Sequence, residues 1–120
     1  MFAAHKKLDN LTIVVDFNNL QIDGTLDEVN SPCPIDEKFA AFGWDVTVID
    51  DGNDFDQIEK AFDHTSTVTG KPSVIIAKTA KGKGVSFMEN QVGWHGKAPD
   101  AAQYADAMNE LNAKLAELEG

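Results

Sequence analysis

The chain has 120 residues, enough for one small domain with a hydrophobic core. Its 20 acidic residues outnumber its 10 basic residues, and the net charge of -10 disfavours binding to nucleic acid or to anionic membranes. No apolar run approaches the roughly 20 residues that a membrane-spanning helix requires. We therefore expect no nucleic-acid or membrane partner, and any phosphate ligand would need a cation or nearby lysines.

The first third of the chain predicts a buried strand followed by a long irregular segment. Residues 2–7 are compatible with the last turns of a helix. Residues 11–15 form a continuous β-branched apolar run, which is typical of a strand buried on both faces of a parallel sheet. Residues 18–34 are polar and rich in turn signals such as Asp23-Gly24, so they predict irregular structure.

Two helices and a second strand are predicted next. Residues 36–42 predict a short helix that ends at Gly43, and residues 44–49 predict a strand. Asp54 is the expected N-cap of a helix over residues 55–66. The stripe expected to pack this helix on the sheet consists of Phe55, Ile58, Ala61 and Phe62.

The last third predicts a third strand, a long loop and a terminal helix. The strand covers residues 73–78, and the loop over residues 79–99 is longer than most connections, which indicates function. The helix covers residues 100–118. Its apolar stripe consists of Tyr104, Met108, Leu111, Leu115 and Leu118.

The alternation of strands and helices predicts an α/β protein with three α/β/α layers and a parallel sheet. Three strands make a small parallel sheet, which normally has helices on both faces and more strands. We therefore expect another chain, or a second copy of this one, to complete it.

Ligands of parallel sheets bind at the carboxyl ends of the strands, and the loop after the first strand is one candidate site. Asn18 and Asn19 lie there. One interpretation is a polar turn in which these amides bond their own backbone. The other is a cage of amide and main-chain oxygens for Mg²⁺ or Ca²⁺.

The loop after the third strand is the second candidate. Its glycines, with Lys81 and Lys83, could surround a phosphate, although a flexible solvated loop would have the same composition. His95 follows in a Trp-His-Gly sequence, and a lone loop histidine is commonly a surface residue.

The histidine and cysteine spacings favour no zinc site. Cys33, the single cysteine, is expected to be a structural thiol in a cytoplasmic protein.

Several spaced motifs occur together in a recognisable order. They are Leu8-Asp9-Asn10-Leu11, Asp16-Phe17-Asn18-Asn19-Leu20-Gln21-Ile22-Asp23-Gly24, Phe42-Gly43-Trp44, Asp51-Gly52-Asn53, Lys71-Pro72, Thr79-Ala80-Lys81-Gly82-Lys83-Gly84 and Trp94-His95-Gly96-Lys97-Ala98-Pro99. The ordered series resembles the N-terminal thiamine-diphosphate-binding domain of the transketolase family. The resemblance extends over nearly the whole chain.

The resemblance implies an enzyme that transfers a two-carbon ketol unit between sugar phosphates, using thiamine diphosphate and Mg²⁺ (or Ca²⁺). By family pattern, the side chain of Asn18 and the main-chain carbonyl of Leu20 are metal ligands. His95 matches the catalytic histidine that reaches the diphosphate and the substrate. The positive charge of the metal would also reduce the repulsion between the diphosphate and an acidic chain.

The chain departs from the family pattern because no Gly-Asp-Gly precedes Asn18, and the Asp of that motif is a metal ligand in the family. We therefore expect residues 1–120 to form a single partial domain, with complementary chains supplying this segment and the pyrimidine-binding domain. Two alternatives remain: a non-enzymatic α/β fragment or interaction module that has lost the cofactor, and a fragment similar to 1-deoxy-D-xylulose-5-phosphate synthase. The residues from Trp94 to Pro99 look more like transketolase.

Overall fold

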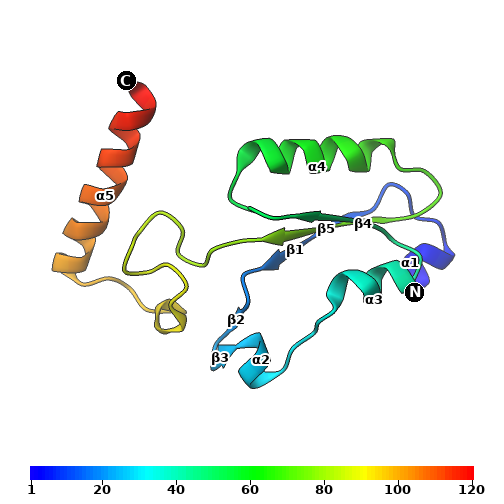
Figure 1. Cartoon of the computed structure of the whole chain (residues 1–120), viewed down its shortest axis with the longest axis horizontal. Coiled ribbons are helices and arrows are strands. Elements are labelled where there is room, and N and C mark those ends of the chain that lie inside the picture. Colours follow the sequence, from blue (N-terminus) through cyan, green and yellow to red (C-terminus); the bar gives the residue numbers. More distant parts are fainter.

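A computed structural model describes residues 1–120, and its centre is a parallel sheet (Figure 1). Strands β1 (Thr12–Phe17), β5 (Ser73–Lys78) and β4 (Asp45–Ile49) lie in the order β1-β5-β4. Both neighbouring pairs are parallel, as the alternation of elements predicted. The last strand in the sequence is therefore the middle strand of the sheet.

The burial of the strands follows this order. In β5 all residues from Ser73 to Ala77 are buried, which explains its continuous apolar sequence. The outer strands are less covered, with Val14 of β1 55% exposed and Val48 of β4 44% exposed. Both outer edges of the sheet lack a neighbouring strand, so their backbone groups face outward.

Helix α4 (Phe55–Thr67) covers one face of the sheet. Asp54 is its N-cap and accepts a hydrogen bond from the Gln57 amide at 3.0 Å, which confirms the predicted cap. Ala61 and Ile58 pack against the strand residues Ile49, Ile75 and Ala77.

The expected apolar stripe of α4 is wrong at two positions. Phe55 is 86% exposed and Phe62 is 48% exposed, whereas Thr65 is buried. Thr65 tolerates burial because its hydroxyl donates to the Phe62 carbonyl at 2.9 Å. The face of α4 that packs on the sheet therefore consists of Ile58, Ala61 and Thr65. A search for apolar residues at helical spacing misses Thr65 because it is polar.

Helix α3 (Ile35–Ala41) lies on the other side of the sheet from α4, which gives the three layers predicted (Figure 1). Its Phe39 ring meets Trp44 edge to face, with the ring centroids 5.3 Å apart. The short helix α1 (Phe2–His5) precedes β1.

The segment predicted to be irregular is partly regular. Strands β2 (Leu20–Gln21) and β3 (Gly24–Thr25) form an antiparallel hairpin, and a one-turn helix α2 (Leu26–Val29) follows. Thr25 and Glu28 form a reciprocal capping box that stabilises α2. The prediction was wrong because such short elements carry no periodicity. The expected turn at Asp23-Gly24 is confirmed at Asp23, whereas Gly24 begins β3.

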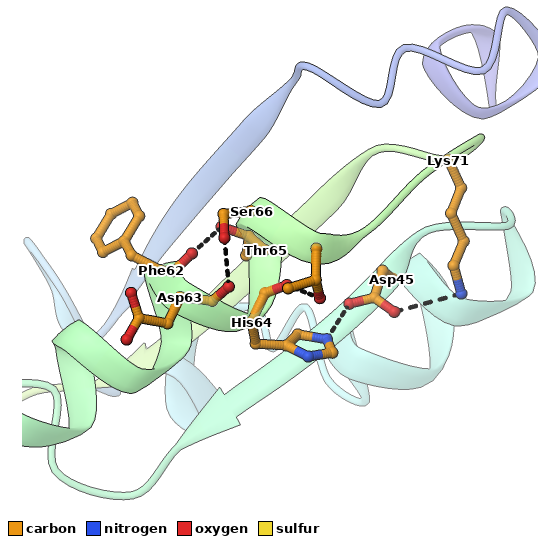
Figure 2. Close-up of polar contacts among 8 residues, drawn as sticks. Asp45, Phe62, Asp63, His64, Thr65, Ser66 and Lys71 are labelled. Carbon is orange, nitrogen blue, oxygen red and sulfur yellow. Dashed lines mark hydrogen bonds and ion pairs between the residues drawn. The ribbon is translucent and has the colours of Figure 1, made fainter.

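A polar cluster joins α4 to the amino-terminal end of β4 (Figure 2). His64 Nε2 lies 2.7 Å from Asp45 Oδ1, and Lys71 Nζ lies 3.3 Å from Asp45 Oδ2. The Asp45 side chain is only 17% exposed. Burial acts to raise the pKa of Asp45, but the hydrogen bonds and charges of His64 and Lys71 outweigh it and lower this pKa.

The C-terminal part extends away from the sheet (Figure 1). It contains a 3₁₀ turn, η1 (Val92–Trp94), and helix α5 (Ala101–Glu119). The predicted stripe of α5 is largely exposed, since Tyr104 is 58%, Leu115 52% and Leu118 85% exposed, and only Ala107 is buried in this helix. No helix of the structure combines the length and the apolar composition needed to cross a bilayer.

Candidate functional site

A cleft of about 530 Å³ lies beyond the carboxyl ends of β1 and β5, the edge at which parallel sheets bind ligands. Asn18, Leu20 and His95, the three residues predicted for the site, all line it. The complete lining is Asp16, Asn18, Leu20, Gln21, Ile22, Asp23, Lys81 and His95. The fold thus brings the loop after β1 together with two parts of the loop after β5.

Asn18 is held in a local turn. Its Oδ1 accepts a hydrogen bond from the Leu20 amide at 3.0 Å, and its Nδ2 donates to Asp16 Oδ1 at 3.4 Å. Asn19 adopts a left-handed φ of 61°, which asparagine tolerates better than most residues. The polar-turn interpretation is therefore confirmed for the Asn18 side chain, and the same turn leaves Asn18 at the cleft.

Lys81 reaches the cleft from the glycine-rich loop after β5. The Lys81 carbonyl accepts from the Asn90 amide at 2.9 Å, which closes the loop on itself. Gly82 has a φ of 74°, and a Cβ there would lie 2.6 Å from the Met88 carbonyl oxygen. The absence of a side chain at Gly82 allows this close approach, so the loop folds back on itself between Gly82 and Met88.

His95 follows η1, which places it at the cleft. Its amide donates to the Val92 carbonyl at 2.9 Å. The preceding Trp94 is anchored, because its Nε1 donates to the Phe87 carbonyl at 3.1 Å and its ring lies 5.4 Å from that of Phe87. Lys97 adds a cation–π contact, with its Nζ 4.7 Å from the centroid of the Trp94 ring.

The donors in the cleft suit a hard cation but form only part of a cage. An amide oxygen and a main-chain carbonyl are ligands that Mg²⁺ and Ca²⁺ accept. No group of three or more His, Cys, Asp or Glu residues in the chain is placed to hold a metal. Lys81 is the single cationic side chain among the lining residues, beside the carboxylates of Asp16 and Asp23. A metal bound here would need additional donor atoms from a bound small molecule, from water or from another chain.

Four lining residues, Asp16, Gln21, Ile22 and Asp23, were not predicted as site residues. Asp16 belongs to β1, and the other three belong to the β2–β3 hairpin; the only sequence signal was their closeness to Asn18. Cys33, expected to be a structural thiol, is exposed and lies in a separate apolar groove of about 300 Å³ between α3 and the sheet.

Comparison with known proteins agrees with this geometry. Residues 1–116 match the family described as transketolase, thiamine diphosphate binding domain. The chain belongs to the transketolase family. The resemblance of its ordered motifs is thereby confirmed.

Transketolase relatives include one of the subunits of the apulose-4-phosphate transketolase of Phocaeicola vulgatus, 41% identical over 94% of this chain and 40% of that protein. The 6-deoxy-6-sulfo-D-fructose transketolase subunit SqwG of Clostridium sp. is 40% identical over 92% of this chain and 40% of that protein. This chain therefore spans about two fifths of the length of these relatives.

Solved transketolases share the fold. A Pichia stipitis transketolase in complex with sedoheptulose-7-phosphate superposes with a TM-score of 0.83 at 26% identity, over 92% of this chain and 16% of that one. A Pichia stipitis transketolase variant in complex with fructose-6-phosphate gives a TM-score of 0.84 at 26% identity, with the same coverage of both chains. The parallel α/β architecture is thus that of the transketolase cofactor-binding domain.

Proposed function

We propose that this chain is part of a thiamine-diphosphate- and Mg²⁺-dependent transketolase that transfers a two-carbon ketol unit between sugar phosphates. The observation that carries the proposal is the cleft in which Asn18, Leu20, Lys81 and His95 meet. We further propose that other chains complete the site, because Asn18 and Leu20 supply only two of the oxygen donors that a hard cation takes. Relatives named as transketolase subunits support an assembly of several chains.

In this proposal the metal is held by Asn18 and Leu20. The Asn18 Oδ1 accepts one hydrogen bond, and an amide oxygen has a second lone pair that can face a cation. Leu20 contributes its main-chain carbonyl, so its side chain is free to form an apolar wall with Ile22. Hard oxygen donors of this kind favour Mg²⁺ over softer metals.

Lys81 and His95 are assigned to the diphosphate and the substrate. The Lys81 ammonium supplies positive charge at the cleft of an acidic chain. His95 is placed to donate a hydrogen bond to a phosphate oxygen or to exchange a proton with the substrate. When bound, the cofactor supplies the nucleophilic carbon, and the protein contributes binding, orientation and electrostatics.

The names of the relatives favour transketolase over the synthase alternative. Those relatives are named for apulose-4-phosphate and for a sulfonated fructose, so substrates within the family differ. We propose sugar phosphates as the substrate class, as the family resemblance implies, and name no individual sugar because the names of these relatives differ. A non-enzymatic fragment remains the outcome that the following experiment separates from an enzyme.

Calorimetry with thiamine diphosphate and Mg²⁺ tests the proposal, on the chain alone and on the chain mixed with the product of a neighbouring gene that carries a Gly-Asp-Gly segment. We expect binding in the mixture, and loss of Mg²⁺-dependent binding by at least about tenfold in Asn18→Ala because a metal ligand is removed. Asn109→Ala, on the exposed part of α5, is the matched control. Absence of binding in both samples would favour the non-enzymatic fragment.

A further inference from the structure

The ends of β1 and β5 are joined beside the cleft by a side-chain contact between Thr79 and Asp16. In the parallel register Asp16 pairs with Ala77 and Phe17 pairs with Lys78, so Thr79 lies immediately beyond the paired residues. The Thr79 amide donates to the Phe17 carbonyl at 3.3 Å. Its hydroxyl donates to Asp16 Oδ1.

The same oxygen of Asp16 contacts Asn18. Asn18 Nδ2 donates to Asp16 Oδ1 at 3.4 Å, while Asn18 Oδ1 accepts from the Leu20 amide at 3.0 Å. Asp16 Oδ1 accepts hydrogen bonds from both Thr79 and Asn18, so it faces the NH₂ end of the Asn18 amide. The oxygen end is therefore directed away from Asp16. We call the connected side chains of Thr79, Asp16 and Asn18 the Asp16 network.

The turn after β4 supports Thr79 from the other side. A Cβ on Gly52 would lie 2.8 Å from both the Ala77 Cβ and the Thr79 Cγ2, so the turn approaches Thr79 as closely as the absence of a side chain allows. The Gly52 amide donates to the Lys78 carbonyl at 2.6 Å. Asn53 Oδ1 accepts from the Ala80 amide at 2.9 Å. Both neighbours of Thr79 are thus held by this turn.

We propose that Thr79 and Asp16 are positioning residues that orient the Asn18 amide, with the turn at Gly52 fixing the place of Thr79. The Asn18 oxygen is then presented in one direction before any ligand arrives, which lowers the reorganisation that binding requires. The value of this orientation for a metal rests on the proposed function, whereas the orientation itself is a property of the free chain. Asp16 lines the cleft, so the competing role is that its carboxylate binds the cation directly.

The first experiment measures the Asn18 side-chain NH₂ signals of the free ¹⁵N-labelled chain by NMR. Thr79→Val removes the hydroxyl, so we expect shifted Asn18 signals and several-fold faster proton exchange, whereas Thr79→Ser keeps the hydroxyl and restores the wild-type signals. Thr12→Val, at the amino end of β1, is the matched control. Asn18 signals in Thr79→Val that match those of the wild type would overturn the proposal, and thermal unfolding of each variant reports whether it is folded.

The second experiment measures Mg²⁺ and thiamine diphosphate affinity by calorimetry in the mixture described above. Asp16→Asn keeps an acceptor oxygen for Thr79 and Asn18, so we expect near wild-type affinity. Asp16→Ala and Thr79→Val break the Asp16 network, and we expect affinities about tenfold weaker, as for other residues that orient metal ligands.

Equal losses in Asp16→Asn and Asp16→Ala would assign the carboxylate itself to the cation and overturn the positioning role. Normal affinity in Thr79→Val would also overturn it. If the wild-type mixture binds no cofactor, the proposed function fails, and the Asn18 signals of the free chain alone decide whether the Asp16 network orients the amide.

Discussion

Asn18 shows how one residue can satisfy two interpretations of a sequence. A polar turn and a metal ligand were alternatives in the sequence, yet the structure gives Asn18 the hydrogen bonds of the turn and also a place in the cleft. The two roles are compatible because an amide oxygen accepts one hydrogen bond from Leu20 and keeps a second lone pair. The turn is what holds the side chain in place for the proposed metal.

Two glycines with the same backbone conformation offer a test of the loop after β5. Gly82 and Gly70 have φ values of 74° and 73°, but a Cβ on Gly82 would lie 2.6 Å from the Met88 carbonyl oxygen, while one on Gly70 would have nothing within 4 Å. We expect Gly70→Ala to cost about 1 kcal/mol of unfolding free energy from its φ alone. Gly82→Ala should cost at least about 1 kcal/mol more because the clash is added.

Urea unfolding followed by tryptophan fluorescence measures this difference, since Trp94 lies in the same loop. The Gly70 variant is the matched control for φ strain. An equal loss of unfolding free energy in the two variants would show that the loop opens to accept the methyl group. The close approach at Met88 would then contribute nothing to stability.

At the scale of elements, the parallel strands and α4 follow from local sequence patterns. Continuous apolar runs identify β1 and β5, and Asp54 identifies the start of α4. The buried face of α4 was predicted only in part, because Thr65 is buried through its own hydrogen bond and Phe55 lies at the uncovered first turn. Burial on a helix depends on what lies opposite, which local pattern does not specify.

The polar cluster of Asp45, His64 and Lys71 gives α4 a pH-dependent attachment to the sheet (Figure 2). The pKa of Asp45 is lowered in the folded chain, so below its ordinary pKa, about 3.9, the unfolded chain binds more protons than the folded one. The stability that Asp45 contributes is present above this value and is lost as the pH falls through the lowered pKa. We expect Asp45→Asn to be less stable than wild type at pH 7.

Urea midpoints at pH 7 and pH 3 measure this effect. Wild type should lose more stability on acidification than Asp45→Asn, because the variant has no carboxylate to protonate at this position. Asp63→Asn, on the exposed surface of α4, is the control and should behave as wild type. An acid sensitivity of Asp45→Asn equal to that of wild type would mean that the cluster adds no pH-dependent stability.

At the scale of the whole molecule, the chain is extended and sparsely buried. Its radius of gyration is 17.6 Å, against about 14 Å for a compact domain of this length. Only 11 of its 120 residues are buried, and the sheet has two open edges. Such a shape leaves apolar surface, including the stripe on α5, available for association.

Association of the free chain should depend on salt. The net charge of -10 keeps copies apart at low ionic strength, whereas the Debye length shrinks from about 30 Å at 0.01 M to about 10 Å at 0.1 M salt. We expect the weight-average sedimentation coefficient to rise between 0.01 M and 0.5 M NaCl. Leu115→Lys on the α5 stripe should reduce the rise, and Lys114→Arg on the same helix is the charge-preserving control. A coefficient independent of salt would show that the exposed surfaces do not self-associate.

The sequence alone determined the class of fold and the family, and it predicted Asn18, Leu20 and His95 as site residues, because strand hydrophobicity, a helix cap and spaced motifs are local features. Only the tertiary structure decided that these residues meet in one cleft with Lys81, and that Thr79 contacts Asp16 across 63 positions of sequence. The physical reason is the parallel register of β1 and β5, which aligns the carboxyl ends of two strands that are distant in the chain. No local pattern encodes that alignment, and it is what converts a turn after one strand and a loop after another into a single site.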